Sequence, residues 1–126
     1  MTNWEDLDIE GKTIKTIEVN DDANRVTITT TDNNNYEMLH HQECCESVDI
    51  QTINGKDSDY DKIVSEFAGA IIGKIAEAVD DVSGEHSESA TLTTYTINTD
   101  KGILTIIWLG ESNGYYGEGV SFYKMK

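Results

Sequence analysis

The sequence predicts an α+β domain: an antiparallel sheet of about six to seven strands with one main helix packed on one face. Two observations predict it. Short runs of β-branched and aromatic residues recur in the first fifty residues and again after residue 90, whereas the middle changes to a helical period. The chain has 126 residues, the size of one domain, so we expect residues 1–126 to form a single α+β domain.

Strands joined by tight turns are expected in the first half. One segment alternates apolar and polar residues, which places Val26 and Ile28 in the core. The chain contains no proline, so its turns must be made by glycine, asparagine and aspartate. The strands are expected at 13–19, 25–31, 36–41 and 48–50, with turns at 20–24 and 32–35.

The middle of the chain is expected to be an amphipathic helix. Apolar residues at spacings of four form one stripe, and Ser58 and Asp59 suit the N-cap position. Gly69 and Gly73 each cost a helix about 1 kcal/mol relative to alanine, so a break near Gly73 is allowed. The stripe consists of Ile63, Phe67, Ile71, Ile75 and Val79.

The last third returns to strands. Residues 90–98 alternate, with Leu92, Tyr95 and Ile97 expected to point inward. Residues 102–109 are apolar on both faces, which is typical of a central strand, and we expect the helix to cover one of its faces. Residues 110–114 include Asn-Gly and predict a hairpin turn that leads into a final strand at 115–125.

Charge is the strongest compositional signal. Aspartate and glutamate number 24 against 9 lysines and arginines, which gives a formal net charge of −15. Such a surface repels nucleic acid and anionic membranes, so direct binding to either is not expected. It attracts basic protein surfaces, although the same charge also serves solubility alone.

The N-terminal residues and the cysteines predict an intracellular protein. Residues 1–6 have no basic or apolar signal-peptide regions, and the apolar stretch 67–78 is too short and interrupted to span a bilayer. Cys44 and Cys45 are adjacent, and neighbours on a strand point to opposite faces, so we expect no disulfide between them. Their pattern suggests a reducing compartment.

Residues 39–46 concentrate histidine, cysteine and glutamate. The residue types suit zinc, but strand alternation leaves each face only one histidine and one cysteine, so no metal site or cofactor is expected. A cysteine nucleophile is also disfavoured, because Glu43 and Glu46 flank the thiols and negative charge raises a thiol pKa. We therefore expect no enzymatic activity.

Two further segments have alternative interpretations. Residues 108–118 form a small-residue loop flanked by aromatics, which either cradles a ligand or packs its rings across a hairpin. Asp57, Asp59 and Asp61 have the spacing that begins a calcium loop, but Ala68 stands where the bidentate glutamate belongs. We interpret them as a solvated helix start.

Three segments in order carry a resemblance. They resemble a family of small proteins of unknown function from bacteriophage genomes and prophage-bearing bacteria. The segments are His40-His41-Gln42-Glu43-Cys44-Cys45-Glu46-Ser47-Val48, then Ser87-Glu88-Ser89-Ala90-Thr91, then Trp108-Leu109-Gly110-Glu111-Ser112-Asn113-Gly114-Tyr115-Tyr116. The resemblance spans Leu7 to Phe122. It implies an acidic accessory protein in the cytoplasm of a host cell, often an inhibitor of a host machine, and brings no established chemistry.

Two functions follow as hypotheses. The first is a binding protein that inhibits a host defence or nucleic-acid enzyme by occupying a basic surface. The second is a module that binds or sequesters a polar metabolite or signalling nucleotide between the two motif segments. The partner-binding carboxylates would be Asp57, Asp59, Asp61, Glu77, Asp80, Asp81 and Glu85, and the ligand-binding residues His40, Gln42, Cys44, Glu46, Ser112, Asn113, Tyr115 and Tyr116. The sequence does not determine the oligomeric state.

Overall fold

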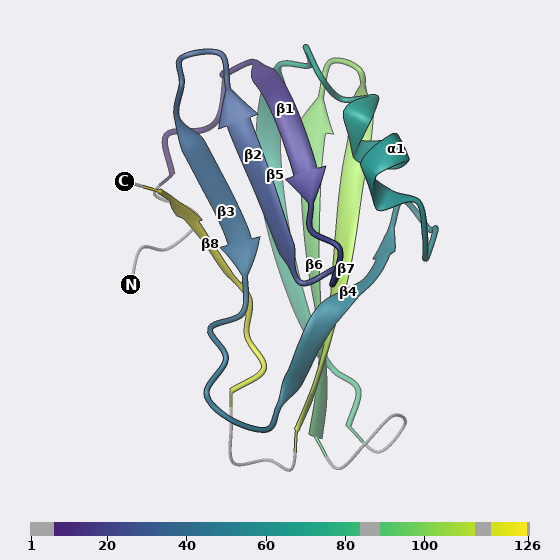
Figure 1. Cartoon of the computed structure of the whole chain (residues 1–126). Coiled ribbons are helices and arrows are strands. Elements are labelled where there is room, and N and C mark those ends of the chain that lie inside the picture. The colour runs from purple at the N-terminus through teal and green to yellow at the C-terminus, as the bar shows by residue number, and fades with distance from the viewer. Residues whose placement is uncertain (1–6, 84–88, 113–116, 126) are drawn as a thin grey trace.

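Figure 1 shows a computed structural model of the chain, which describes residues 7–83, 89–112 and 117–125. Within these ranges the chain forms eight strands and one short helix. In chain order they are β1 (Ile14–Val19), β2 (Arg25–Thr30), β3 (Asn35–Leu39), β4 (Ser47–Ile53), α1 (Tyr60–Ser65), β5 (Ile72–Asp81), β6 (Ser89–Thr99), β7 (Gly102–Ser112) and β8 (Ser121–Lys124).

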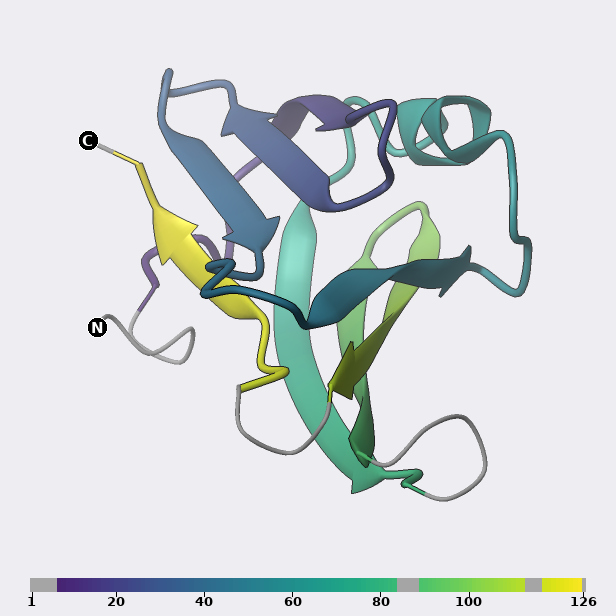
Figure 2. The same cartoon turned by 60° about the horizontal axis from the view of Figure 1, so that its bottom comes forward.

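The strands form two four-stranded antiparallel sheets rather than one. The first has the order β1-β2-β3-β8, and the second has the order β4-β7-β6-β5. The sheets face each other as two layers, with their strands running obliquely (Figures 1 and 2). The prediction of a single sheet was therefore wrong, whereas antiparallel pairing was right for the consecutive strands within each sheet: β1–β2, β2–β3, β5–β6 and β6–β7.

One hydrophobic core fills the space between the sheets. Val26 and Ile28 are buried as predicted, and the largest fully buried side chains are Trp108, Tyr36 and Tyr95. Tyr95 and Ile97 of β6 point inward as expected. Leu92 does not, because the buried residues of this strand alternate and the third one is Thr93. Alternation therefore predicts most core positions correctly once a strand is recognised.

The predicted long helix is the main error, and the fold is nearly all-β instead of α+β. α1 ends at Ser65, and residues 72–81 form a strand that pairs with β6. Gly69 has a φ of 86°, a left-handed conformation that interrupts a helix. At Gly73 a Cβ would lie 3.3 Å from the backbone oxygen of Asn98, so glycine allows β6 to approach β5 closely. The pairing of the two strands shifts register here, between Ile72 and Ile75. The β-branched residues that follow then favour the strand.

Helix α1 does not cover β7 as expected. It contacts β1 at the edge of the other sheet. The outward-facing Ile103 of β7 is 56% exposed, and Ile107 and Leu109 are half-buried. No helix in the described ranges is long and apolar enough to cross a membrane.

The predicted C-terminal hairpin is also absent. β8 pairs with β3, through Leu39–Ser121 and three further pairs, and not with β7. The chain passes from one sheet to the other twice: between β3 and β4 at residues 40–46, and between β7 and β8, where the structure describes residues 117–120. Both crossings lie at the same end, because Leu39 is opposite Ser121 and Ser47 is opposite Glu111. The described parts of all three motif segments meet there, because Ser89 of the second segment is opposite Ser112 of the third.

Candidate functional site

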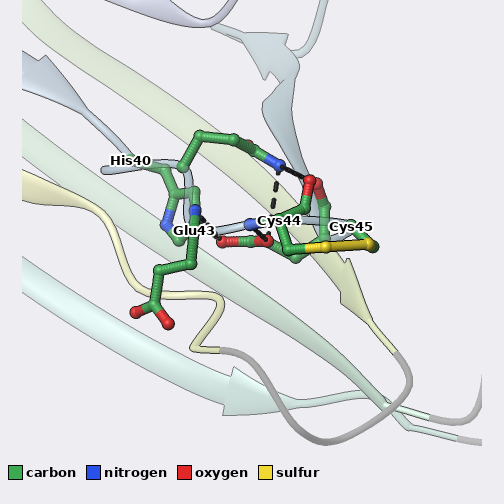
Figure 3. Close-up of a disulfide and its surroundings, with 6 residues drawn as sticks. His40, Glu43, Cys44 and Cys45 are labelled. Carbon is green, nitrogen blue, oxygen red and sulfur yellow. Dashed lines mark hydrogen bonds and ion pairs between the residues drawn. A yellow bond between two sulfur atoms is a disulfide. The ribbon is translucent and has the colours of Figure 1, made fainter.

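The first crossing is organised around the buried carboxylate of Glu46. Figure 3 shows His40, Glu43, Cys44 and Cys45 of this loop. The Glu46 carboxylate accepts hydrogen bonds from the backbone N–H of Glu43 at 2.8 Å and of Cys44 at 2.9 Å, and it lies 2.7 Å from His40 Nε2. The bond with His40 and the two amides outweigh burial and lower the pKa of Glu46 from 4.5 to about 2. Glu46 is therefore ionised at neutral pH and fixes the loop.

His40 joins the two crossings. Its Nε2 faces Glu46, and its Nδ1 lies 2.6 Å from the carbonyl oxygen of Gly119. The imidazole therefore bridges the carboxylate of Glu46 and the backbone of Gly119 through its two ring nitrogens. The side chain of His40 is 7% exposed, so this bridge is shielded from water. The bridge ties loop 40–46 to the segment before β8.

Cys44 and Cys45 form a disulfide with each other, contrary to the prediction. The prediction assumed that both lie on a strand, where adjacent side chains diverge. β3 ends at Leu39, so the cysteines lie in the loop, where that alternation does not apply. Both are exposed, and both sulfur atoms belong to this bond, so neither is a free thiol in this state.

A second buried carboxylate, Glu118, lies in the other crossing. Thr91 donates a hydrogen bond to it at 2.7 Å, and Ser112 donates another. Burial raises the pKa of Glu118, but the hydroxyls of Ser112, Ser89 and Thr91 outweigh burial and hold the pKa below its ordinary value. Glu118 is thereby bound to both β6 and β7.

Gly110 of β7 provides the space for Glu118. A Cβ at this position would lie 2.7 Å from the Cβ of Glu118 and 2.9 Å from its carbonyl oxygen. It would also lie 3.2 Å from Cγ2 of Val48. The glycine therefore allows the second crossing to pack directly on the backbone of β7.

A polar hollow of about 410 Å³ opens beside the first crossing. Arg25, whose side chain is 55% exposed, lies there with its Nε 3.8 Å from Glu37 Oε1. The wall thus combines a guanidinium with amide groups and carboxylates, a set able to bind a small polar molecule. The lining residues are Asn24, Arg25, Leu39, His40, Gln42, Glu46, Ser47, Val48 and Asp49.

An acidic hollow of about 540 Å³ lies on the other side of the β1–β2 turn. Asp59, with a φ of 57°, precedes α1, and Asp61 accepts a hydrogen bond from the Val19 N–H at 3.3 Å. The turn between the hollows is docked on β4, because the N–H of Ile50 donates to the Ala23 oxygen at 2.7 Å. The hollow is lined by Val19, Asn20, Asp21, Ala23, Asp57, Asp59, Tyr60, Asp61 and Lys62.

The structure brings together only part of the predicted ligand site. His40, Gln42 and Glu46 line the polar hollow. Cys44 and Ser112 do not: Cys44 is bonded to Cys45, and Ser112 donates a hydrogen bond to Glu118. Asn113, Tyr115 and Tyr116 lie outside the described residues. Within the described ranges, no group of three or more histidine, cysteine, aspartate or glutamate side chains is placed to hold a metal ion.

The predicted partner surface divides into two separate parts. Asp57, Asp59 and Asp61 line the acidic hollow, while Asp80 and Asp81 end β5. Asp81 is opposite Thr91, which is opposite Gly110, which in turn is opposite Val48. This second group therefore lies at the end of the sheet where the chain crosses between the sheets. Glu77 is half-buried further along β5, and Glu85 lies outside the described residues.

Sequence reasoning missed Arg25, Thr91 and Glu118. Arg25 was treated as the start of a strand, and Thr91 as part of another. Glu118 stands between Gly117 and Gly119, and a charged residue between two glycines was the available signal of a tightly packed turn.

The protein is thus a two-layer β domain with a candidate site in its loops, held by the carboxylates of Glu46 and Glu118. This architecture does not by itself indicate a chemical reaction. The family model described as a domain of unknown function (DUF7448) matches residues 8–122. The chain belongs to this family. Searches of curated proteins and of solved structures found no match.

Proposed function

We propose that the protein acts by binding and inhibits a macromolecular partner by occupying its basic surface with the acidic hollow. The observation that supports this most directly is the hollow itself, in which four aspartates, Asp21, Asp57, Asp59 and Asp61, face a single lysine, Lys62. As a phage-type accessory protein, it would act on a host defence or nucleic-acid enzyme in the host cytoplasm.

The charges of this hollow are available to a partner. The ion pairs within the described ranges use Asp8, Asp32, Glu37 and Glu46, and none of the four hollow aspartates. The net charge of −15 adds long-range attraction for a basic surface. Exposed charges further apart than about 8 Å are screened at physiological salt, so binding should weaken steeply as salt rises.

A pull-down from host lysate with a triple amide variant tests this proposal. Asp57→Asn, Asp59→Asn and Asp61→Asn remove three charges and little else, because asparagine tolerates the left-handed conformation of residue 59 and keeps an oxygen to accept from Val19. We expect a basic enzyme to be retained by the wild type at low salt, released at high salt, and lost by the variant.

The matched control removes the same charge elsewhere. Glu10→Gln, Glu43→Gln and Asp100→Asn change the net charge equally, and these three exposed carboxylates do not line the hollow. Retention by this control with loss by the hollow variant supports the proposal. Equal loss in both would assign binding to net charge alone, and binding that does not depend on salt would refute an electrostatic mechanism.

The polar hollow supports a second candidate, binding of a small polar metabolite or nucleotide signal. The specific observation is Arg25, whose guanidinium supplies local positive charge beside His40 and Gln42 in an otherwise acidic protein. A ligand at 100 times its dissociation constant adds about 2.7 kcal/mol of stability. A thermal-shift screen of anionic metabolites should therefore find a stabiliser whose effect Arg25→Gln removes, and a screen without one would reject this candidate.

A further inference from the structure

The disulfide between Cys44 and Cys45 encloses no stretch of chain. A disulfide stabilises a fold mainly by restricting the unfolded chain, to an extent that grows with the length of the loop it closes. These cysteines are neighbours, with Cα atoms 3.7 Å apart, and there is no intervening loop to restrict. This bond therefore does not serve as a structural cross-link of the fold.

The loop is held in place without the disulfide. The N–H groups of Glu43 and Cys44 donate to Glu46, and Gln42 donates to the carbonyl oxygen of Cys44 at 3.2 Å. His40 connects Glu46 to Gly119. None of these bonds uses a sulfur atom, so breaking the S–S bond leaves all of them possible.

The two sulfur atoms are accessible to solvent. Cys44 and Cys45 are both exposed, and Figure 3 shows the S–S bond at the side of the loop away from the labelled side chains of His40 and Glu43. Accessible disulfides with no structural role are those that react most readily with external thiols.

We propose that Cys44–Cys45 is a reversible thiol–disulfide site whose co-substrate is a dithiol. A thiolate of the reductant attacks one sulfur, forms a mixed disulfide and expels the other cysteine as a thiolate. The second thiol of the reductant then attacks the mixed disulfide and releases the first cysteine. Two electrons and two protons pass to the protein, and the reductant leaves as its disulfide. The inference concerns this loop alone and does not depend on the acidic hollow.

The charge of the protein selects among reductants. The attacking species is already an anion, and it approaches a molecule with a formal net charge of −15. A reductant with an additional negative group meets more repulsion than a neutral one of the same size. Salt screens this difference. The site should therefore favour neutral or cationic thiols at low salt.

Redox titration of the full-length protein tests the proposal. The purified protein is equilibrated with mixtures of reduced and oxidised dithiothreitol, free thiols are alkylated, and the intact mass is measured. We expect both thiols to appear together, with half-reduction at one ratio, and to disappear again on reoxidation without dimer formation. Thiols that stay free under oxidising conditions, or that oxidise only between chains, would overturn the proposal.

Two controls separate this chemistry from a change in the fold. Cys44→Ser and Cys45→Ser each leave one cysteine, which must give no intramolecular disulfide. The reduced and oxidised wild type should melt within about 4 °C of each other, since no loop is closed. A larger loss of melting temperature on reduction would make the bond structural and contradict the inference.

A pair of matched thiols tests the selectivity. 2-Mercaptoethanol is neutral and 2-mercaptoethanesulfonate carries one negative charge. Rates of opening, compared at equal thiolate concentration, should favour the neutral thiol several-fold at low salt and converge at high salt. Equal rates at low salt would show that the charge of the protein does not act at this bond.

Discussion

The substitution Gly110→Ala tests whether the segment around Glu118 packs directly on the backbone of β7. The added methyl group would lie 2.7 Å from the Cβ of Glu118 and 2.9 Å from its carbonyl oxygen. Atoms of this kind do not approach within 3.0 Å, so the backbone at Glu118 must move. Val48 would have to move as well, because its Cγ2 lies 3.2 Å from the added carbon.

The expected loss of stability combines two effects. Overpacking a well-filled site costs about 1–3 kcal/mol. Displacement of Glu118 also weakens the hydrogen bonds from Thr91 and Ser112, and bonds to a charged group contribute about 1.5–3 kcal/mol each. Because the segment can relax and keep part of them, we expect a loss of about 2–4 kcal/mol.

Urea unfolding with linear extrapolation measures this loss. Gly117→Ala is the matched control, because it lies in the same segment and a Cβ there has nothing within 4 Å. Its free energy of unfolding should stay within about 0.5 kcal/mol of the wild type. If Gly110→Ala costs no more than Gly117→Ala, Glu118 does not pack on β7 as described.

Three further predictions concern single side chains. The pKa of Glu46 is lowered from 4.5 to about 2, so its contribution to stability is present above pH 4.5 and is lost as the pH falls toward 2. Carbon-detected NMR should show its carboxyl titrating near pH 2, and a midpoint near 4.5 would contradict the hydrogen bonds from His40 and the loop amides. Asp59→Gly should raise the free energy of unfolding by about 0.5–1 kcal/mol in thermal or urea melts, because Asp59 has a φ of 57°, and a loss instead would show that the residue is not strained. Tyr95→Phe should lower it by about 1 kcal/mol through loss of the bond to the Val120 oxygen at 3.2 Å; no change would mean that this bond contributes nothing.

The first half of the fold could be predicted because its signals are local. Alternation in 25–31 located β2, and Asp-Asn clusters located the turns, including Asn33 with a φ of 67°. The stripe from Ile63 to Val79 was ambiguous, because apolar residues four apart fall on one face of a strand as well as of a helix. Pairing with β6, a non-local interaction, decided between them.

The part of the candidate site that could be predicted is also the part whose residues are close in sequence. His40, Gln42 and Glu46 are close in sequence, and the structure places them in one hollow. Arg25 and Glu118 join this end of the molecule only through strand pairing and the second crossing, which no local pattern indicates. The disulfide was missed because a strand was assumed to extend through a loop.

The placement of both crossings at one end has a consequence for the order of folding. His40 and Gly119, which are 79 residues apart, come together only when β8 pairs with β3. Contacts between distant residues form slowly, because the intervening chain must first lose its freedom. We expect the amides of β8 to gain protection in pulse-labelled hydrogen exchange later than those of the β1–β2 hairpin. During synthesis, the region around His40 would therefore remain incomplete until β8 has left the ribosome.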